Sequence, residues 1–310
     1  MNYHVLTLFP EMIEAAFHTS ITGRAAGKGL LSLDAVNIRD YAEEKRKGRI
    51  DDYSYGGGAG MIMQAEPVWR ACQDVLEKIR LRQQTEETGQ SAETNETAET
   101  DQVAETNETA ETDQTAGTNE AAENGRTAGT AEKKTRVIYM SPAGKTFDQG
   151  LAAELAEEED LIFLCGHYEG IDQRVLDEIV TDEISIADYV LTGGELPALV
   201  CMDTIARLVE GVLSNEDSAQ TESFMGDGLL EYPQYSRPEV WHEKAVPPIL
   251  LSGDHAAVDR WRREQSLLRT AQRRPDLCER AVLDRKDRKF VAENGLEKYY
   301  LSEDTQAENH

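Results

Sequence analysis

The sequence is poor in cysteine, in histidine clusters and in long apolar runs. Its four cysteines lie far apart, and Cys165 and Cys201 fall in apolar stretches, which favours reduced, buried thiols over a disulfide framework. The six histidines form no His-Cys or HxxxH cluster, so a dedicated metal site is not expected. There is no run of roughly eighteen apolar residues and no basic, apolar leader, which predicts a cytoplasmic protein without a membrane partner.

Basic residues are also in the minority. The 310 residues include 32 Lys and Arg against 59 Asp and Glu, a net charge of −27, which at first argues against a polyanionic partner. Residues 83–132, however, carry thirteen acidic side chains and one basic, so this stretch alone accounts for −12 of the net charge. Local patches therefore decide whether the chain binds a nucleic acid.

The acidic stretch has almost no apolar side chains. Residues 92–102 recur at 104–114 and, in degraded form, from 116 onward. Such a repeat cannot bury enough surface to offset an ordering entropy of roughly 1–2 kcal/mol per residue. After a helix from Glu66 to about Arg82, we therefore expect residues 83–132 to form a disordered acidic Glu/Thr/Ala repeat insertion, which is either a tether or an expanded repeat tract.

The rest of the chain first alternates strands with helices. We predict strands at 3–9, 31–38, 136–139, 161–165 and 183–186, with a helix at 11–26 between the first two. Strand, helix, strand is typical of a parallel α/β sheet. From Gly228 onward the pattern becomes helical.

Two glycine-containing turns directly follow apolar strands. Residues 161–165 lack polar alternation, as in a strand covered on both faces, and Gly166 then opens a loop that ends at Gly170. A second loop, residues 192–197, follows the strand at 183–186 and the stretch 187–191. Ligands bind outside the carboxyl ends of strands in open α/β sheets, so the two loops form either one pocket or two ordinary turns.

Two other glycine-containing segments carry weaker signals. Residues 144–146, Gly-Lys-Thr, resemble the end of a nucleotide-triphosphate loop, but Tyr139 stands where that loop needs glycine and Pro142 removes a backbone donor, so an ATP-binding switch is not expected. The glycine run at 55–60 follows the basic cluster at 45–49. It either cradles an anion or a flat base, or is simply a mobile loop.

Residues 260–274 hold six arginines and one glutamate. Arg262, Arg269 and Arg273 fall on roughly one face of the expected helix, close to Trp261. A solvated helix face is the simplest explanation. In an otherwise acidic protein, this cluster favours a phosphate-binding surface.

The two strand-end loops belong to longer motifs. CGHYEGIDQRV at 165–175 and SIADYVLTGGELPA at 185–198 resemble the cofactor loops of the bacterial tRNA (guanine-N(1)-)-methyltransferase (TrmD) family, which is part of the SPOUT class of knotted methyltransferases. Further motifs in the same order cover nearly the whole chain: LFPEM at 8–12, TGRA at 22–25, DDYSYGGGAGM at 51–61, YMSPAGK at 139–145, GLLEYPQYSRP at 228–238 and VPPILLSGDH at 246–255.

The resemblance implies an α/β fold: a SPOUT-type parallel sheet with a deep trefoil knot, plus a small helical C-terminal domain. We expect a methyltransferase domain at 1–213, a flexible interdomain linker at 214–224, a helical basic tRNA-binding domain at 225–303 and a tail at 304–310. The resemblance also implies a homodimer with a shared active site.

The implied reaction is transfer of a methyl group from S-adenosyl-L-methionine to the guanosine immediately 3′ of the anticodon in tRNA. By resemblance, three loops bind the cofactor, through Tyr139, Met140, Ser141, Pro142, Gly166, Tyr168, Glu169, Gly170, Ile186, Ala187, Asp188, Tyr189, Val190, Leu191, Gly193 and Gly194. Arg24, Gly58 and Gly60 join the three arginines as expected RNA-binding residues. Family enzymes use Mg²⁺, but no cluster of protein ligands is visible, and its role stays open.

The ring nitrogen of guanine carries a proton at neutral pH, so a carboxylate base should accelerate methylation by roughly 10²–10⁴-fold. The resemblance points to Glu222 as this base, where the family has aspartate, and to Arg207 as the arginine that offsets charge on the guanine oxygen. Both would come from the partner subunit. Without the resemblance, Glu222 is a solvated linker acid.

Two further departures affect the cofactor loops. His167 stands where the family has arginine. Ala187 stands where the family has glycine, and we expect its added methyl group to weaken cofactor binding. Glu222 and Ala187 together leave an alternative, a catalytically silent RNA-binding protein of the same fold.

Overall fold

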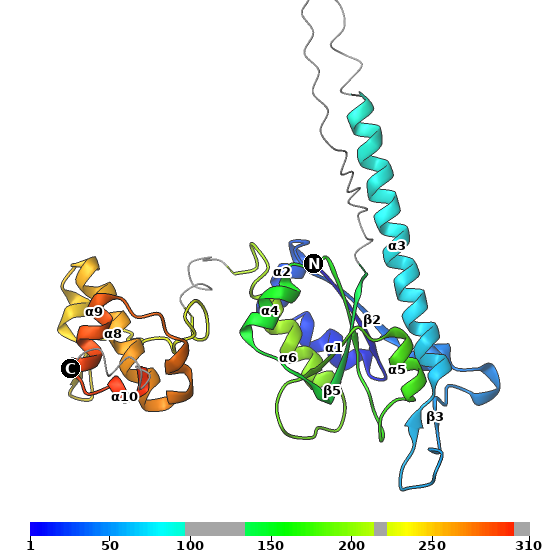
Figure 1. The fold of residues 1–310 in the computed structure, drawn as a ribbon. Helices are drawn as coiled ribbons and strands as arrows, with labels where there is room; N and C mark the ends of the chain where they lie inside the picture. Colours follow the sequence, from blue (N-terminus) through cyan, green and yellow to red (C-terminus); the bar gives the residue numbers. More distant parts are fainter. Residues whose placement is uncertain (97–133, 214–221, 301–310) are drawn as a thin grey trace, which may run out of the picture. The chain divides into compact units, whose positions relative to one another are not determined.

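The computed structural model of this chain describes residues 1–96, 134–213 and 222–300. The chain divides into two compact units. The first contains residues 1–18, 31–146 and 158–200, and the second contains residues 19–30, 147–157 and 201–310. The first unit holds the sheet (Figure 1).

The sheet has five strands, β1 (Asn2–Thr7), β2 (Ser32–Asn37), β5 (Arg136–Thr146), β6 (Asp160–Leu164) and β7 (Asp182–Ser185). Their order is β2-β1-β6-β5-β7, and every neighbouring pair is parallel. The prediction of a parallel α/β sheet is confirmed. Because all five strands run the same way, their carboxyl ends meet at one edge.

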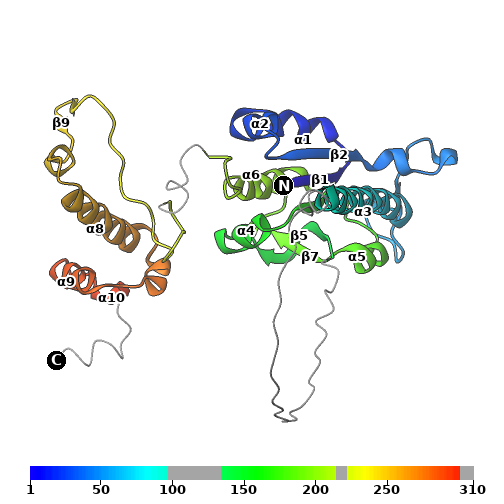
Figure 2. The same cartoon turned by 90° about the horizontal axis from the view of Figure 1, so that it is seen from above.

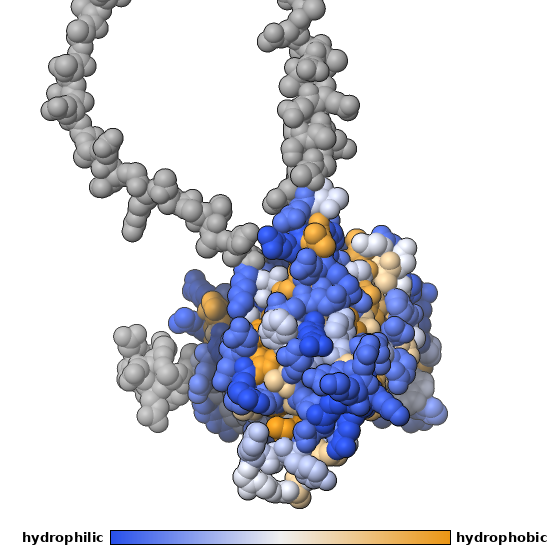
Figure 3. Space-filling view, turned by 90° about the vertical axis from the view of Figure 1, so that its right-hand side faces the viewer, coloured by the Kyte–Doolittle hydropathy of each residue, from blue (hydrophilic) through white to orange (hydrophobic). Residues whose placement is uncertain are grey.

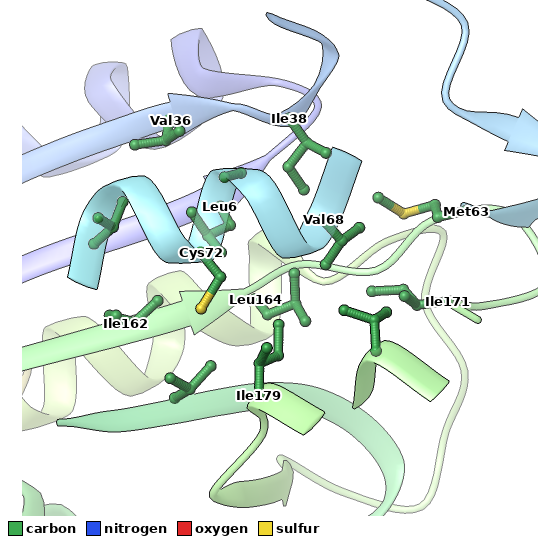
Figure 4. Close-up of a cluster of buried hydrophobic side chains, with 14 of the residues drawn as sticks. Leu6, Val36, Ile38, Met63, Val68, Cys72, Ile162, Leu164, Ile171 and Ile179 are labelled. Atoms are coloured by element: carbon green, nitrogen blue, oxygen red, sulfur yellow. The ribbon is translucent and has the colours of Figure 1, made fainter. Parts of the chain in front are cut away.

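Both faces of the sheet are covered. Along β6 all five residues are buried, as the unbroken apolar run at 161–165 indicated for all but the first of them, Asp160. One face packs against α3 (Ala65–Glu96) and α5 (Gln173–Ile179), which lie on the same side of the sheet in both views (Figures 1 and 2). Figure 4 shows the core between them, which includes Leu6, Val36, Val68, Cys72, Ile162, Leu164 and Ile179.

The opposite face carries the alternate residues of the strands. Tyr3 and Phe163 are fully buried there, with their ring centroids 6.3 Å apart. Phe17 of α1 (Pro10–Phe17) meets the Tyr3 ring edge-on at 6.0 Å. Successive side chains of β1 and β6 point to opposite faces of the sheet, so each strand contributes apolar residues to the core on both faces.

The cysteines behave as the sequence indicated. All four are free and buried. Burial raises the pKa of Cys72 to about 11 and that of Cys201 to about 12, so both remain neutral thiols.

The single helix predicted at 11–26 is wrong. Helix α1 ends at Phe17, and α2 (Ser20–Gly27) begins after Thr19, whose backbone is extended at φ −107° and ψ 162°. Thr and Ser side chains compete for backbone hydrogen bonds and favour helix ends, which explains a break here.

The start of the expected disordered insertion is also helical, because α3 continues to Glu96. Glu, Gln and Ala have high helix propensities. Arg82 Nε lies 3.7 Å from a carboxylate oxygen of Glu86, one turn on, and Thr85 Oγ1 donates to the Leu81 carbonyl at 2.8 Å. The expectation of disorder is therefore wrong for residues 83–96, and residues 97–132 lie outside the described part of the chain.

A short excursion connects β2 to α3. It comprises the 3₁₀ turns η1 (Ile38–Tyr41) and η2 (Glu44–Arg46) and the antiparallel pair β3 (Asp51–Asp52) and β4 (Ile62–Met63). The glycine-rich segment 54–61 joins β3 to β4. Met63 is fully buried and bridges in parallel to Ile171, which ties this excursion to the loop after β6.

The second unit contains α2, α4 (Gln149–Ala156) and the carboxyl-terminal segment. That segment includes the ladder β8 (Val240–Trp241) with β9 (Lys244–Ala245), then η3 (Pro248–Leu251), α8 (His255–Arg273), η4 (Pro275–Arg280), α9 (Arg285–Glu293) and α10 (Glu297–Tyr300). Its core includes Leu267, Cys278 and Val291, and Tyr300 Oη donates to the Leu267 carbonyl at 2.5 Å.

The expected helical pattern from Gly228 is wrong for the first part of this segment, since its α-helices begin only at His255. Pro233, Pro238, Pro247 and Pro248 interrupt residues 228–254, and proline removes a helix donor. Residues 214–221 of the expected linker and residues 301–310, which include the tail, lie outside the described residues.

The face of the molecule seen in Figure 3 is largely hydrophilic. Hydrophobic residues form only small, separate spots on it.

A partly buried ion cluster links β1, β2, β6 and α3, with His4 and Asp160 as its buried members. His4 Nε2 lies 3.1 Å from an oxygen of Asp160, which also pairs with Arg82, and His4 Nδ1 lies 3.8 Å from Asp34. Burial alone would lower the pKa of His4, but hydrogen bonds to the two aspartates outweigh it and raise that pKa above its usual range. The pKa of Asp160 is lowered, since bonds to His4 and Arg82 outweigh the opposite effect of burial.

These shifts predict a pH-dependent stability. A raised His4 pKa means that its stabilisation is complete below the unfolded pKa of about 6.5 and is lost as the pH rises through the folded value. We expect the difference in free energy of unfolding between the wild type and His4→Gln to be largest between about pH 4 and 6. Urea unfolding across this pH range measures it. A difference that does not change with pH would contradict the protonated pair.

Candidate active site

A pocket of about 260 Å³ lies at the carboxyl edge of the sheet, beside the ends of β5, β6 and β7. All of the residues expected to bind the cofactor line it except Asp188, which is exposed. The pocket also includes residues that the expectation did not cover: His167, Ile184, Ser185, Thr192 and Pro197. The two glycine turns therefore form one pocket, with a third loop from β5.

The loop after β6 is held by backbone hydrogen bonds. Cys165 N–H donates to the Leu6 carbonyl at 2.9 Å, which continues the β1–β6 pairing to the last residue before Gly166. Gly170 has a φ of 130° and Tyr168 a φ of 61°, so the loop turns through left-handed backbone. Glu169 N–H donates to the Met61 carbonyl at 2.9 Å and joins the loop to the glycine-rich segment.

The β5 segment leaves the sheet and returns to it. Met140 and Lys145 both pair with Ile184 of β7, so residues 141–144 project from the strand. A Cβ on Gly144 would overlap the backbone of Glu183, which explains glycine at the point of return. The Gly-Lys-Thr sequence thus closes a bulge of β5, and the strand-breaking Pro142 was the signal for it.

The third loop follows β7 and closes against the first. Ser185 Oγ and Tyr189 N–H both donate to the Ala187 carbonyl, at 3.1 and 3.0 Å, and set a tight turn. Gly194 N–H donates to the Gly166 carbonyl at 3.0 Å. A Cβ on Gly194 would lie 2.7 Å from Cys165 Cα, so this close approach requires glycine.

The charge lining the pocket is sparse. Among the described lining residues, Glu169 is the only carboxylate, and no lysine or arginine is present. Tyr139 presents its phenol beside Gly166, and burial raises the pKa of Tyr139, so it remains a neutral hydroxyl. The pocket is therefore suited to a small ligand that carries positive charge.

The glycine-rich segment lies against this pocket. A Cβ on Gly60 would be 2.5 Å from Glu169 Cγ, and Gly60 has a φ of 91°. Gly58 is exposed in the same loop, with a φ of 128°. The resemblance added three expected RNA-binding residues. Gly58 and Gly60 thus lie in one loop, while Arg24 is exposed on α2.

The two expected catalytic residues contact each other. Arg207 directly follows α6 (Glu195–Ala206). Its Nη2 lies 2.6 Å from both carboxylate oxygens of Glu222. Both side chains are about one-third exposed, at 34% and 37%, and neither lines the pocket in the first unit. The arginine thus holds both oxygens that a base would use.

The arginines of α8 fall into two groups. Arg260 and Arg263 both pair with the buried Asp287, and Arg263 also pairs with Asp227 at 2.7 Å, so these two stabilise the domain. Just after the helix, Arg274 pairs with Asp276. Much of the local positive charge seen in the sequence is therefore neutralised internally.

Two of the three arginines expected to bind RNA are more available than these. Arg262 pairs with Asp259 at 3.1 Å, and its guanidinium lies 5.0 Å from the centroid of the Tyr232 ring. Arg269 and Arg273 are exposed and form no ion pair with any described residue. Arg269 lines a hollow with Tyr232 and Gln234. This face can offer positive charge to a polyanion.

In residues 1–96, 134–213 and 222–300, no group of three or more His, Cys, Asp or Glu side chains could hold a metal ion. Within that same range, no helix has the length and apolar content that crossing a membrane requires.

The fold and the pocket are those of an α/β protein with a pocket at the carboxyl ends of its parallel strands. The family model described as tRNA (Guanine-1)-methyltransferase TrmD matches residues 1–108 and 117–280. The chain therefore belongs to the tRNA (guanine-1)-methyltransferase TrmD family, and the resemblance seen in the sequence is confirmed.

Relatives with known names support this assignment over nearly the full length. The tRNA (guanine-N(1)-)-methyltransferase of Lachnoclostridium phytofermentans is 49% identical over 305 residues, which cover 98% of this chain and 99% of that protein. The enzymes of the same name from Lachnospira eligens and Alkaliphilus oremlandii are 46% and 44% identical and cover 93% and 94% of this chain, and 99% and 97% of their own lengths.

The two groups of arginines lead to a prediction. We expect Arg269→Ala combined with Arg273→Ala to weaken tRNA binding and to reduce the slope of log affinity against log salt by about 1–2. Binding measured across a salt series tests it. The matched control is Lys286→Ala with Lys289→Ala, which removes the same charge from the exposed face of α9 and should leave the slope unchanged. Equal effects of the two pairs would mean that only the net charge of the domain matters.

Proposed function

We propose that this chain is a tRNA (guanine-N(1)-)-methyltransferase that transfers a methyl group from S-adenosyl-L-methionine to the guanosine immediately 3′ of the anticodon. The observation that carries the proposal is that the residues matched by the family model include the loops that line the pocket. The family match spans the three loops, and these loops line one pocket.

The described residues fit the proposed cofactor. S-adenosyl-L-methionine supplies a methyl group on a positively charged sulfonium. The pocket offers Glu169 and no cationic lysine or arginine, and Gly166, Gly193 and Gly194 leave room where a Cβ would meet a neighbour. The loops also carry backbone N–H and C=O groups, which can read an adenine ring without ordering long side chains. Ala187 lines the pocket as well.

Glu222 is proposed as the base that removes the guanine proton, and Arg207 as the group that offsets charge on the guanine oxygen. Their hydrogen bonds to each other support a joint role. Guanine binding must free one carboxylate oxygen of Glu222, and the guanidinium can then turn toward the base. Glutamate in place of the usual aspartate extends the reach of this carboxylate by one methylene.

Several features of the proposal follow from the family rather than from a measured contact. The sheet is proposed to carry the SPOUT fold with its deep trefoil knot. Two chains are proposed to form a homodimer in the cytoplasm, in which Arg207 and Glu222 of one chain act on a guanosine held at the pocket of its partner. Mg²⁺ is proposed to take part without a dedicated protein site.

The tRNA is proposed to contact Arg24, the glycine-rich loop at Gly58 and Gly60, and α8 through Arg262, Arg269 and Arg273. The contact of Gly60 with Glu169 supports a target base beside the cofactor pocket. The ion pairs of Arg260 and Arg263 with Asp287 support two separate roles, in which some arginines stabilise the domain and others bind phosphate.

A catalytically silent RNA-binding protein of the same fold is the second candidate. Glu222 in place of aspartate and Ala187 in place of glycine favour it. Both candidates bind RNA, and only turnover distinguishes them.

Transfer of labelled methyl from S-adenosyl-L-methionine to unmodified tRNA transcripts tests the proposal. We expect transfer to transcripts with guanosine after the anticodon and none when that guanosine is changed. Binding of both ligands without transfer would favour the silent RNA-binding protein. Absence of cofactor binding would reject the assignment of the pocket.

Glu222→Ala should lower turnover by roughly 10²–10⁴-fold, because the base is lost, while the affinity for S-adenosyl-L-methionine stays within about twofold. Single-turnover kinetics and calorimetric titration measure the two quantities. Glu222→Asp is the matched variant, which keeps the carboxylate and should retain turnover. Parallel loss of turnover and cofactor affinity in Glu222→Ala would count against the base.

A further inference from the structure

A buried carboxylate lies behind the pocket, at the first residue of α6. Glu195 is only 3% exposed, and each of its carboxylate oxygens has a partner. Thr7 Oγ1 donates to Oε1 at 2.6 Å, and Nε2 of His167 lies 2.7 Å from Oε2. A buried carboxylate is tolerated only when such bonds replace water, so both partners are needed.

The two partners are themselves linked. Phe9 N–H donates to Thr7 Oγ1 at 3.0 Å, and the Phe9 ring meets the His167 ring at 5.0 Å with an interplanar angle of 60°. The contacts among Thr7, Phe9, His167 and Glu195 therefore form a closed ring. Its members come from the end of β1, the loop after β6 and the start of α6.

The third loop leaves space for this ring of contacts. A Cβ on Gly193 would overlap the imidazole of His167 and lie 2.7 Å from Glu195 Oε2. His167 also lines the pocket, and its backbone N–H lies 3.3 Å from Met63 Sδ. The imidazole thus lies between the carboxylate and the pocket, in a space that only glycine at 193 provides.

We propose that Glu195 is a positioning residue for the methyl-donor pocket, which acts through His167. The inference rests on the proposed binding of S-adenosyl-L-methionine in this pocket. By holding His167 and Thr7 together, the carboxylate sets the spacing between residues 166–170 and 192–194, which enclose the cofactor. Neither Glu195 nor Thr7 touches the reacting atoms.

The departure at position 167 agrees with this role. Histidine and arginine both donate N–H groups to a carboxylate, although arginine is longer and presents two of them. What this position must supply is therefore a donor for Glu195. Arginine should restore that function where alanine cannot.

The test measures S-adenosyl-L-methionine affinity by calorimetry and methyl-transfer kinetics on tRNA, with Glu195→Gln, His167→Ala and His167→Arg. We expect Glu195→Gln and His167→Ala to weaken cofactor binding about tenfold or more, since one charge-assisted hydrogen bond is lost. KM for the cofactor should rise, while kcat at saturating cofactor stays within about threefold. His167→Arg should recover most of the affinity that His167→Ala loses.

His4→Ala is the matched control. It breaks another buried histidine–carboxylate pair on the same sheet, His4 with Asp160, which does not line the pocket. It should lower the melting temperature and leave cofactor affinity unchanged. If His4→Ala weakens cofactor binding as much as His167→Ala, general destabilisation explains the effect and the inference is wrong.

The outcomes separate the inference from the function on which it rests. A wild type that binds and turns over the cofactor, with Glu195→Gln and His167→Ala variants that bind it equally well, would overturn the positioning role alone. A wild type that does not bind the cofactor would overturn both. If Glu195→Gln does not fold, the pair His167→Ala and His167→Arg still decides the question, because His167 lies at the pocket wall.

Discussion

The parallel pairing of β6 with β1 on one side and β5 on the other fixes the position of every loop in the pocket. Leu164 of β6 pairs with both Leu6 of β1 and Tyr139 of β5, so these three strands reach the carboxyl edge of the sheet at the same level. The loops that follow therefore meet without long connections. Close backbone approaches at Gly144 and Gly194 then draw β7 and the start of α6 into the same assembly. The chemistry of the site is thus set by backbone geometry first and by side chains second.

Charge is distributed in a way that the net value of −27 conceals. Acidic residues concentrate in the insertion, while several arginines of the carboxyl-terminal segment are paired with buried or nearby aspartates. An arginine that is paired with Asp287 binds a phosphate weakly, because the carboxylate and the phosphate would compete for the same N–H donors. Exposed arginines without such partners are the ones that can bind RNA. The number of arginines in the segment is therefore larger than the number that is free to bind phosphate.

The sequence was sufficient for the parts of the fold that depend on local pattern. The unbroken apolar run at 161–165 correctly predicted a central buried strand, and the glycines after it correctly predicted loops at its carboxyl end. Features that depend on contacts distant in sequence were not predictable. Thr7 and Glu195 are 188 residues apart, and the pairing of both Met140 and Lys145 with Ile184 depends on β7. The continuation of α3 beyond Arg82 has a different cause, because the Glu, Gln and Ala residues there have high helix propensities even though the segment is poor in apolar side chains.

The contact between Arg207 and Glu222 shows how the two proposed catalytic residues are kept ready. Separately, the partly exposed side chains of an arginine and a glutamate would each sample many rotamers, and ordering both at the guanine would cost side-chain entropy. The bifurcated contact, in which Nη2 of Arg207 lies 2.6 Å from both carboxylate oxygens of Glu222, already restricts them. Exposed ion pairs contribute little to stability, so this one can be exchanged for contacts with RNA at small cost. Their mutual neutralisation also keeps an unpaired carboxylate away from the approaching phosphates. On this view the pair is a resting state, and a correctly seated guanine competes for both partners at once.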